Sequence, residues 1–88
     1  MTKAAKCRYR IATTGGIERC TGWVLGILGA RRGPAGWEVT HLPTGVCVAV
    51  YPNKATAMDE LEALHHHGLP WWWEEWLSKC KRLPSEEP

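Results

Sequence analysis

The sequence predicts an α+β domain in which an antiparallel sheet of three or four strands is followed by two helices that pack on one face of the sheet. Residues 6–12 alternate between apolar and basic side chains, residues 37–64 have the pattern of a tight hairpin followed directly by an amphipathic helix, and a second helical pattern comes next. Strands that precede helices in this way indicate the α+β class. The expected strands span about residues 5–13, 23–30, 36–42 and 45–51, and the expected helices about residues 53–67 and 70–82.

The length and the aromatic content describe one small domain with a modest core. A chain of 88 residues hides only about 60% of the surface that its unfolded form exposes. The sequence contains six Trp and no Phe, and each Trp can bury on the order of 150–250 Å². We expect residues 1–83 to form the domain, residues 84–88 to be a disordered tail, and part of the indole surface to stay exposed.

Residues 6–12 predict a half-buried strand, because side chains of two kinds alternate strictly with a period of two. The residues that follow, TTGG at positions 13–16, are typical of a turn. The apolar face of the strand carries Cys7, Tyr9 and Ile11, and the opposite face carries Lys6, Arg8 and Arg10.

Residues 17–30 admit two interpretations, a strand buried on both faces or part of a short helix. The glycines in this stretch weaken a helix by about 1 kcal/mol each, and they also loosen a strand. The apolar run at residues 23–30 is short, rich in branched side chains and bounded by glycine, which favours the strand. The polar residues 31–36 that follow are expected to form a connection.

The hairpin is expected between residues 36–42 and 45–51, with PTG at residues 43–45 in the turn. Pro fits the second position of a type I turn, and Gly supplies the left-handed residue that closes a three-residue loop. A three-residue loop pairs Leu42 with Val46, whereas a four-residue loop shifts the pairing by one and exchanges the faces. Both registers leave apolar groups on both faces, so we expect the hairpin to be central in the sheet.

Two helices are expected after the hairpin. Asn53 is a sound N-cap for the first helix, and Gly68 fits the residue that ends it. Pro70 fits the first turn of the second helix. The residues of that helix that follow the spacing of one buried face are Trp73, Trp76, Leu77 and Cys80.

Charge is divided unevenly along the chain, and no segment has the pattern of a membrane span or a secretory leader. Residues 1–36 carry seven Lys or Arg and one Glu, and residues 37–88 carry four Lys or Arg and eight Asp or Glu. This asymmetry favours either an anionic partner for the first part or attraction between the two parts. The longest apolar run has eight residues, whereas a membrane span needs about 20. We therefore expect a cytoplasmic protein, without membrane contact, whose Cys residues are reduced thiols.

Metal binding and catalysis are not expected from these side chains. The Cys residues form no CxxC pair, and three successive His at 65–67 point about 100° apart on a helix, so the paired ligands of a structural zinc site are missing. Cys47 and His41 are the best candidates for a nucleophile and its base, although a packed thiol is commoner in a strand pair. We expect no enzymatic activity, cofactor, metal or small-molecule substrate.

The tryptophan-rich second helix is the first candidate binding surface. Residues 71–76 place four indoles within six residues, and one helix face can bury two or three of them. Exposed indoles are typical of interface hot spots; the alternative is that all four complete an undersized core. The sequence therefore predicts a non-enzymatic module that binds an unidentified protein, or its own copy as a homodimer, through Trp71, Trp72 and Trp76.

The basic N-terminal strand is the alternative binding surface. Its cations can neutralise phosphates while an exposed Trp or Tyr stacks on bases. The isoelectric point of 8.4 lies below the value of about 9 that is typical of nucleic-acid-binding domains, and a solvated strand face is the simpler interpretation. The alternative function is that of a nucleic-acid-binding accessory protein that uses Lys6, Arg8, Arg10, Arg31 and Arg32.

Residues 37–64, with the hairpin sequence VTHLPTG and the helix sequence KATAMDELEAL, resemble segments of short proteins of phages and bacterial prophages. The resemblance covers about a third of the chain and implies no particular activity. At the level of the fold, strands followed by a helix also resemble the three-stranded DNA-binding domain of phage-type integrases. That likeness implies that the sheet, rather than a helix, meets DNA, and here the basic face of such a sheet would belong to the N-terminal strand.

Overall fold

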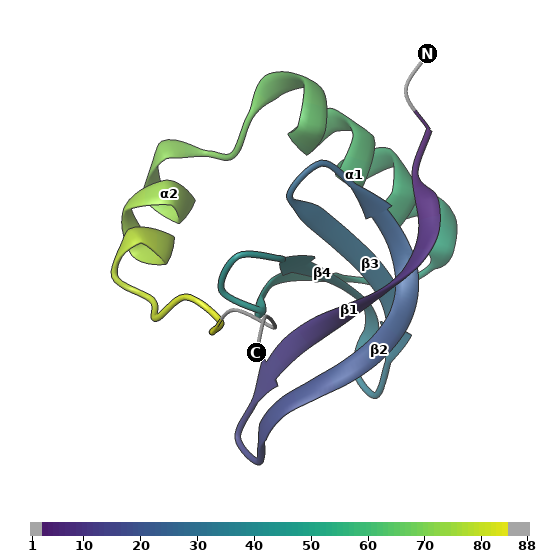
Figure 1. The fold of residues 1–88 in the computed structure, drawn as a ribbon. Coiled ribbons are helices and arrows are strands. Elements are labelled where there is room, and N and C mark those ends of the chain that lie inside the picture. The colour runs from purple at the N-terminus through teal and green to yellow at the C-terminus, as the bar shows by residue number, and fades with distance from the viewer. Residues whose placement is uncertain (1–2, 85–88) are drawn as a thin grey trace.

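The computed structural model describes residues 3–84, which form a five-stranded antiparallel sheet followed by two helices (Figure 1). Strands that are neighbours in the sequence are neighbours in the sheet, and the predicted α+β class is confirmed. The predicted disordered tail lies outside the described residues except for Pro84. The elements are β1 (Ala5–Thr13), β2 (Gly16–Leu25), β3 (Leu28–Gly33), β4 (Gly36–His41), β5 (Val46–Tyr51), α1 (Lys54–His67) and α2 (Trp71–Ser78).

Within residues 3–84 the sheet has five strands, not the three or four that the sequence predicts. The difference lies in residues 16–33, which form a hairpin where a single strand over residues 23–30 is predicted. Leu25 pairs with Leu28, so the two residues between them make a tight turn. The first of these, Gly26, has a φ of 62°, the left-handed conformation that a two-residue hairpin turn requires.

Strand β1 curls back over the sheet, and two glycines make room for it. The ring of Tyr9 lies on Gly29 of β3, where a Cβ atom would come within 2.7 Å of the Tyr9 Cε2 atom. At Gly22 of β2, a Cβ atom would lie 3.0 Å from the Tyr9 hydroxyl oxygen. The curl also brings the Ala12 N–H to the Gly45 carbonyl oxygen, to which it donates at 2.7 Å. Glycine in these two strands therefore permits the close approach of β1.

The β4–β5 hairpin lies at one edge of the sheet, where β5 is the last strand, and not at its centre as the sequence predicts. It contains a β-bulge that combines the two predicted registers. Next to the turn, His41 pairs with Val46, which is the register of a four-residue loop. Beyond the bulge, Val39 pairs with Ala49, which is the register of a three-residue loop. The extra residue of the bulge shifts the pairing by one, and Val39 is fully buried in the core as a result.

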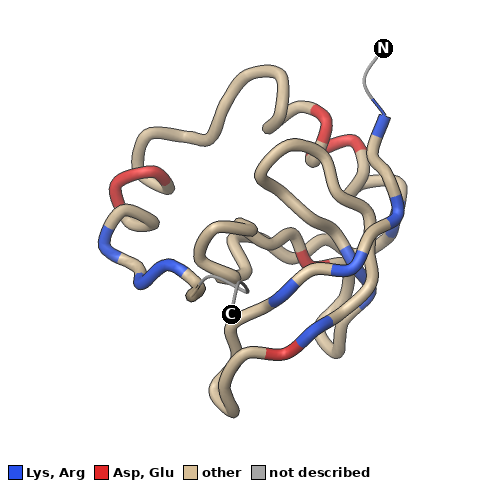
Figure 2. The backbone as a smooth tube through the Cα atoms, viewed as in Figure 1, with Lys and Arg blue, Asp and Glu red and all other residues tan. Residues whose placement is uncertain are grey.

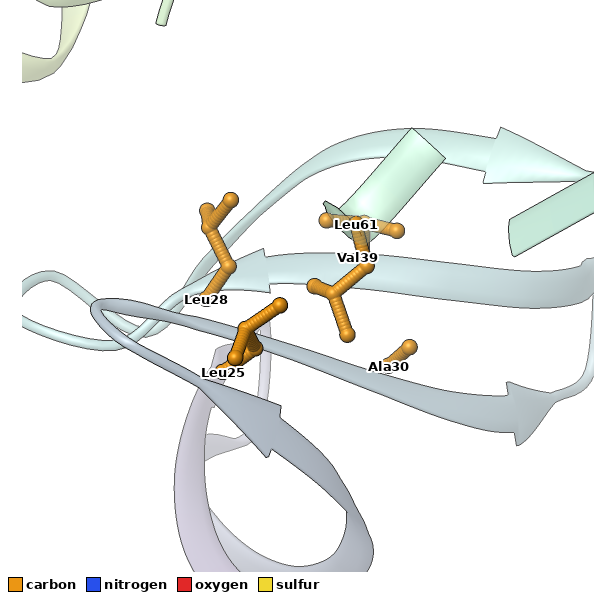
Figure 3. Close-up of a cluster of buried hydrophobic side chains, with 5 residues drawn as sticks. All are labelled: Leu25, Leu28, Ala30, Val39 and Leu61. Carbon is orange, nitrogen blue, oxygen red and sulfur yellow. The ribbon is translucent and has the colours of Figure 1, made fainter. Parts of the chain in front are cut away.

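The main core lies between the sheet and α1, which contacts β2, β3, β4 and β5. Asn53 caps this helix as predicted, because its side-chain oxygen accepts a hydrogen bond from the Thr56 N–H at 2.9 Å. Gly68 ends the helix, with a φ of 82°. Figure 3 shows the buried cluster that joins the sheet to the helix, which consists of Leu25, Leu28, Ala30, Val39 and Leu61.

Helix α2 is shorter than predicted and stands at the margin of the sheet instead of lying flat on its face (Figure 1). It spans Trp71–Ser78 rather than residues 70–82, and Pro70 is its N-cap. The predicted packing of two helices on one face therefore holds for α1 and not for α2, which has Leu77 as its buried residue.

Candidate functional site

Three indoles of α2 are exposed on the surface. Trp71, Trp72 and Trp76 have 70%, 56% and 44% of their area exposed, respectively. The sequence places Trp76 with Trp73 on the buried side of the helix, and the structure contradicts this for Trp76. The buried side is narrow and centred on Leu77, and successive residues point about 100° apart on a helix. The side chain of Trp76 therefore turns to solvent.

The exposed indoles share one side of α2 with two opposite charges. Trp71 and Trp72 are in edge-to-face contact, with ring centroids 5.7 Å apart and an interplanar angle of 89°, an arrangement that aromatic pairs favour. Four exposed residues, at positions 72, 75, 76 and 79, follow the i, i+3, i+4, i+7 spacing of one helix face. We call this surface the tryptophan face; it comprises Trp71, Trp72, Glu75, Trp76 and Lys79.

Contacts on both sides of α2 set its position. Before the helix, the Gly68 N–H donates to the Leu64 carbonyl oxygen at 2.9 Å, which ends α1 and turns the chain. After the helix, the Leu83 N–H donates to the Pro43 carbonyl oxygen at 2.9 Å. This second contact attaches the C-terminal segment to the β4–β5 turn. The buried side chain of Leu77 and the contact of the segment after the helix thus hold α2 next to the sheet.

A cleft of about 570 Å³ lies behind α2, between that helix, the end of α1 and the β2–β3 and β4–β5 turns. Its walls are mainly apolar, and His41 is among the polar side chains at its edge. The His41 Nδ1 atom lies 2.9 Å from the Thr44 hydroxyl oxygen. Burial, with a smaller contribution from the Arg82 charge, lowers the pKa of His41, so the imidazole is neutral at neutral pH. Because the cleft separates α2 from the turns of the sheet, the helix has Leu77 as its buried residue.

The sheet register gathers basic side chains on one face of β1, β2 and β3. Arg10 pairs with Arg19 in the β1–β2 ladder, and directly paired residues point to the same face. Lys6 and Arg8 share that face because side chains alternate along a strand. Arg32 of β3 points to the same face through the pairing of β2 with both neighbours. We call these residues the basic face; it comprises Lys6, Arg8, Arg10, Arg19 and Arg32.

The acidic residues of the described sheet both point to the opposite face. Glu18 pairs with Ile11, and Glu38 pairs with Arg31. The Arg31 Nη2 atom lies 3.0 Å from the Glu38 Oε1 atom, and their side chains are only 19% and 17% exposed. Of the five residues predicted for nucleic-acid binding, Arg31 is therefore separated from the others. The remaining four lie together on the basic face.

The structure adds an aromatic side chain and two cations to this region. Trp23 pairs with Lys6, and the Lys54 Nζ atom lies 4.6 Å from the centroid of the Trp23 ring, within the range of a cation–π interaction. The sequence suggests Arg19 only as a cation near the basic strand, and it does not suggest Lys54 at all. A two-residue turn within TTGG would have placed Arg19 opposite Arg10, whereas nothing in the sequence signals the contact of Lys54 with Trp23.

Cys47 and His41 are not arranged as a nucleophile and a base. Cys47 pairs with Thr40, and His41 pairs with Val46, so the two side chains point to opposite faces of the sheet. Burial raises the pKa of the Cys47 thiol, and the charge of Glu38 raises it further. The thiol is therefore protonated at neutral pH, and a thiol in that state is a poor nucleophile.

Among residues 3–84, no group of three or more His, Cys, Asp or Glu side chains is placed to hold a metal ion. No helix in the described part of the chain is both long and apolar enough to cross a membrane. No protein-family model, curated protein or solved structure matches the chain. The resemblance to phage and prophage proteins therefore stays a prediction, and the tryptophan face and the basic face are the surfaces on which a function can be argued.

Proposed function

We propose that this protein is a non-enzymatic binding module that engages a protein partner through Trp71, Trp72 and Trp76. The observation that carries the proposal is the exposure of these three indoles, between 44% and 70%, on one eight-residue helix. Trp is among the residues most enriched in interface hot spots. A large apolar patch on the surface of a small protein is typical of an interaction site.

The way α2 is attached also supports this proposal. Leu77 fills the buried side of the helix, and the Leu83 N–H attaches the segment after the helix to the β4–β5 turn. These contacts hold α2 from the side opposite to the exposed indoles. Indoles have few rotatable bonds, so they offer a large contact area at a low cost in conformational entropy.

Truncation of one exposed indole and of one buried side chain on the same helix tests this proposal. We expect Trp72→Ala to lower the free energy of unfolding by about 1 kcal/mol or less, as surface substitutions usually do. Leu77→Ala, the matched control, should lower it by about 2–5 kcal/mol. The measurement is equilibrium unfolding in urea at submicromolar protein. A loss for Trp72→Ala as large as that for Leu77→Ala would place this indole in the core and overturn the proposal.

A second candidate function is the binding of nucleic acid by the basic face. One observation favours it: the cations Lys6 and Arg8 are exposed, while Glu18 and Glu38 of the described sheet point to the other face. A surface on which the sheet contributes only positive charge attracts phosphates, and it releases counterions when they bind. Trp23, at the edge of this surface, supplies an aromatic ring of the kind that stacks on bases.

The salt dependence of binding tests the second candidate. We expect labelled single- and double-stranded DNA to bind at low salt in fluorescence anisotropy. Lys6→Gln and Arg8→Gln should each reduce the slope of log K against log salt by about 1. Lys79→Gln, which removes an exposed cation of the tryptophan face instead, is the control and should leave the slope unchanged. No binding at low salt, or equal effects of all three variants, would refute this function.

A further inference from the structure

The tryptophan face lies on a helix whose charges are ordered along its axis. Glu74 and Glu75 lie in the middle of α2, and Lys79, Lys81 and Arg82 follow at and beyond its end. All five of these residues are exposed. Figure 2 shows the acidic colour on α2 and the basic colour on the segment that follows it. Of these charged residues, Glu75 and Lys79 belong to the tryptophan face, whereas Glu74 and Arg82 line the cleft behind α2.

We propose that the partner of the tryptophan face is a second copy of this chain, whose α2 packs antiparallel against the first. This inference rests on the proposed function, since it uses the same indoles, and it goes further by naming the partner. An antiparallel copy places Glu75 of each helix against Lys79 of the other, whereas a parallel copy in the same register would place like charges together. The dipoles of the two helices also oppose each other in this orientation.

The spacing of the charged residues fits a two-fold axis. An axis that passes midway between Glu75 and Lys79 pairs each of them with the other residue of the second copy, and it does so twice, as an isologous interface requires. Trp76 lies one residue from that midpoint, about 1.5 Å along the helix, so the two Trp76 indoles meet near the axis. Trp72 lies one turn farther out. It is opposite the basic segment that follows α2 in the second copy, where a cation can contact its ring.

The area of the indoles indicates a dimer of moderate affinity. With about 200 Å² for a whole Trp side chain, exposures of 70%, 56% and 44% amount to roughly 350 Å² of indole in each copy. Two copies thus bring about 700 Å², about half of the 1,200–2,000 Å² that stable interfaces bury. An interface of this size is typical of weak or transient association. We expect a dissociation constant in the micromolar range that increases with salt.

Exchange of the charges tests the second copy as partner. Glu74→Lys with Glu75→Lys leaves only basic charge on the tryptophan face, and Lys79→Glu with Lys81→Glu leaves only acidic charge there. In sedimentation equilibrium, we expect the wild type to dimerise. The dissociation constant of each double variant for itself should be at least about tenfold higher. An equimolar mixture of the two variants should form a heterodimer of nearly wild-type affinity. Circular dichroism and urea unfolding establish that each variant is folded.

Several outcomes would overturn this inference. They are a wild type that stays monomeric at all concentrations, double variants that dimerise as the wild type does, and a mixture that does not restore the dimer. When acrylamide still quenches the indoles of such a monomer, the protein-binding function stands and the second copy alone is rejected as the partner. A loss of stability for Trp72→Ala equal to that for Leu77→Ala would reject both.

Discussion

Gly29 controls how closely strand β1 lies on the sheet. A Cβ atom at this position would stand 2.7–2.9 Å from three ring atoms of Tyr9, closer than the contact distance of carbon atoms. The Tyr9 side chain is only 8% exposed, and burial raises the pKa of its phenol. The ring therefore cannot move away from Gly29 without losing its place between β1 and β3.

Alanine at Gly29 should consequently be far more costly than alanine at a glycine with open surroundings. We expect Gly29→Ala to lower the free energy of unfolding by about 1–3 kcal/mol, because the added methyl group forces the Tyr9 ring and β1 outward. Gly15→Ala is the matched control, since the nearest atom to its Cβ position is the Thr13 hydroxyl oxygen at 3.8 Å. Urea unfolding of both variants measures the difference. Equal losses would show that the Tyr9 contact does not limit this position.

The roles of the glycines illustrate what single residues reveal before a structure is known. The sequence alone shows Gly22, Gly26 and Gly29 as a weakness of any helix or strand over residues 17–30. In the structure, Gly26 makes a turn, and the other two make room for Tyr9. The Tyr9 contact joins strands that are distant in sequence, so no local pattern could have predicted it.

At the scale of elements, the β2–β3 hairpin was hidden by its turn. Turns are usually recognised from polar residues beside glycine, but here the residue after Gly26 is Ile27, which is 51% exposed at the tip of the turn. Residues 16–22 are mostly exposed, so they lack the apolar alternation that indicates a half-buried strand. The apolar run at residues 23–30 therefore has the pattern of one buried strand although it contains the ends of two.

The segment from β4 to α1 was predictable because its signals are local. Asn53 marks the start of α1 through its side-chain oxygen, and Gly68 marks the end through its backbone N–H. Both bonds lie within one turn, as is usual for capping residues. The turn residues allow two registers for the β4–β5 hairpin, and the bulge at Val39 and Thr40 accommodates both. A bulge depends on packing against α1 as well as on the turn, so the turn residues alone could not predict it.

Helix α2 shows the limit of periodicity as a guide to burial. The spacing of Trp73, Trp76 and Leu77 predicts one buried face when a helix lies flat on a core. Here the segment after α2 is attached to the β4–β5 turn, and the helix itself buries Leu77. Trp76 points away from the side that Leu77 buries, so it is exposed. The position of a helix relative to the sheet is a tertiary property, and it decided which of these side chains became surface. The expected exposure of Trp71 or Trp72 is confirmed, because both are exposed.

At the scale of the whole molecule, the uneven charge of the sequence becomes a division in space. Figure 2 shows mostly positive charge along β1 and β2, with acidic colour on β2 near the β1–β2 turn, and negative charge on α1. Acidic and basic charge also follow one another along α2 and the segment after it. The asymmetry along the chain was visible in the composition, but its assignment to one sheet face depends on the β1–β2 and β2–β3 registers. The tryptophan face and the basic face lie on different elements, so the two proposed functions can be tested by separate substitutions.

The accessibility of the indoles in the monomer tests the central claim, which is that α2 presents three of the six Trp to solvent. The measurement is acrylamide quenching of tryptophan fluorescence at submicromolar protein, where a micromolar dimer dissociates. We expect about half of the fluorescence to be accessible, and we expect a variant with Phe at positions 71, 72 and 76 to lose most of that accessible part. A wild-type monomer whose fluorescence is almost wholly shielded from acrylamide would contradict this account of the protein.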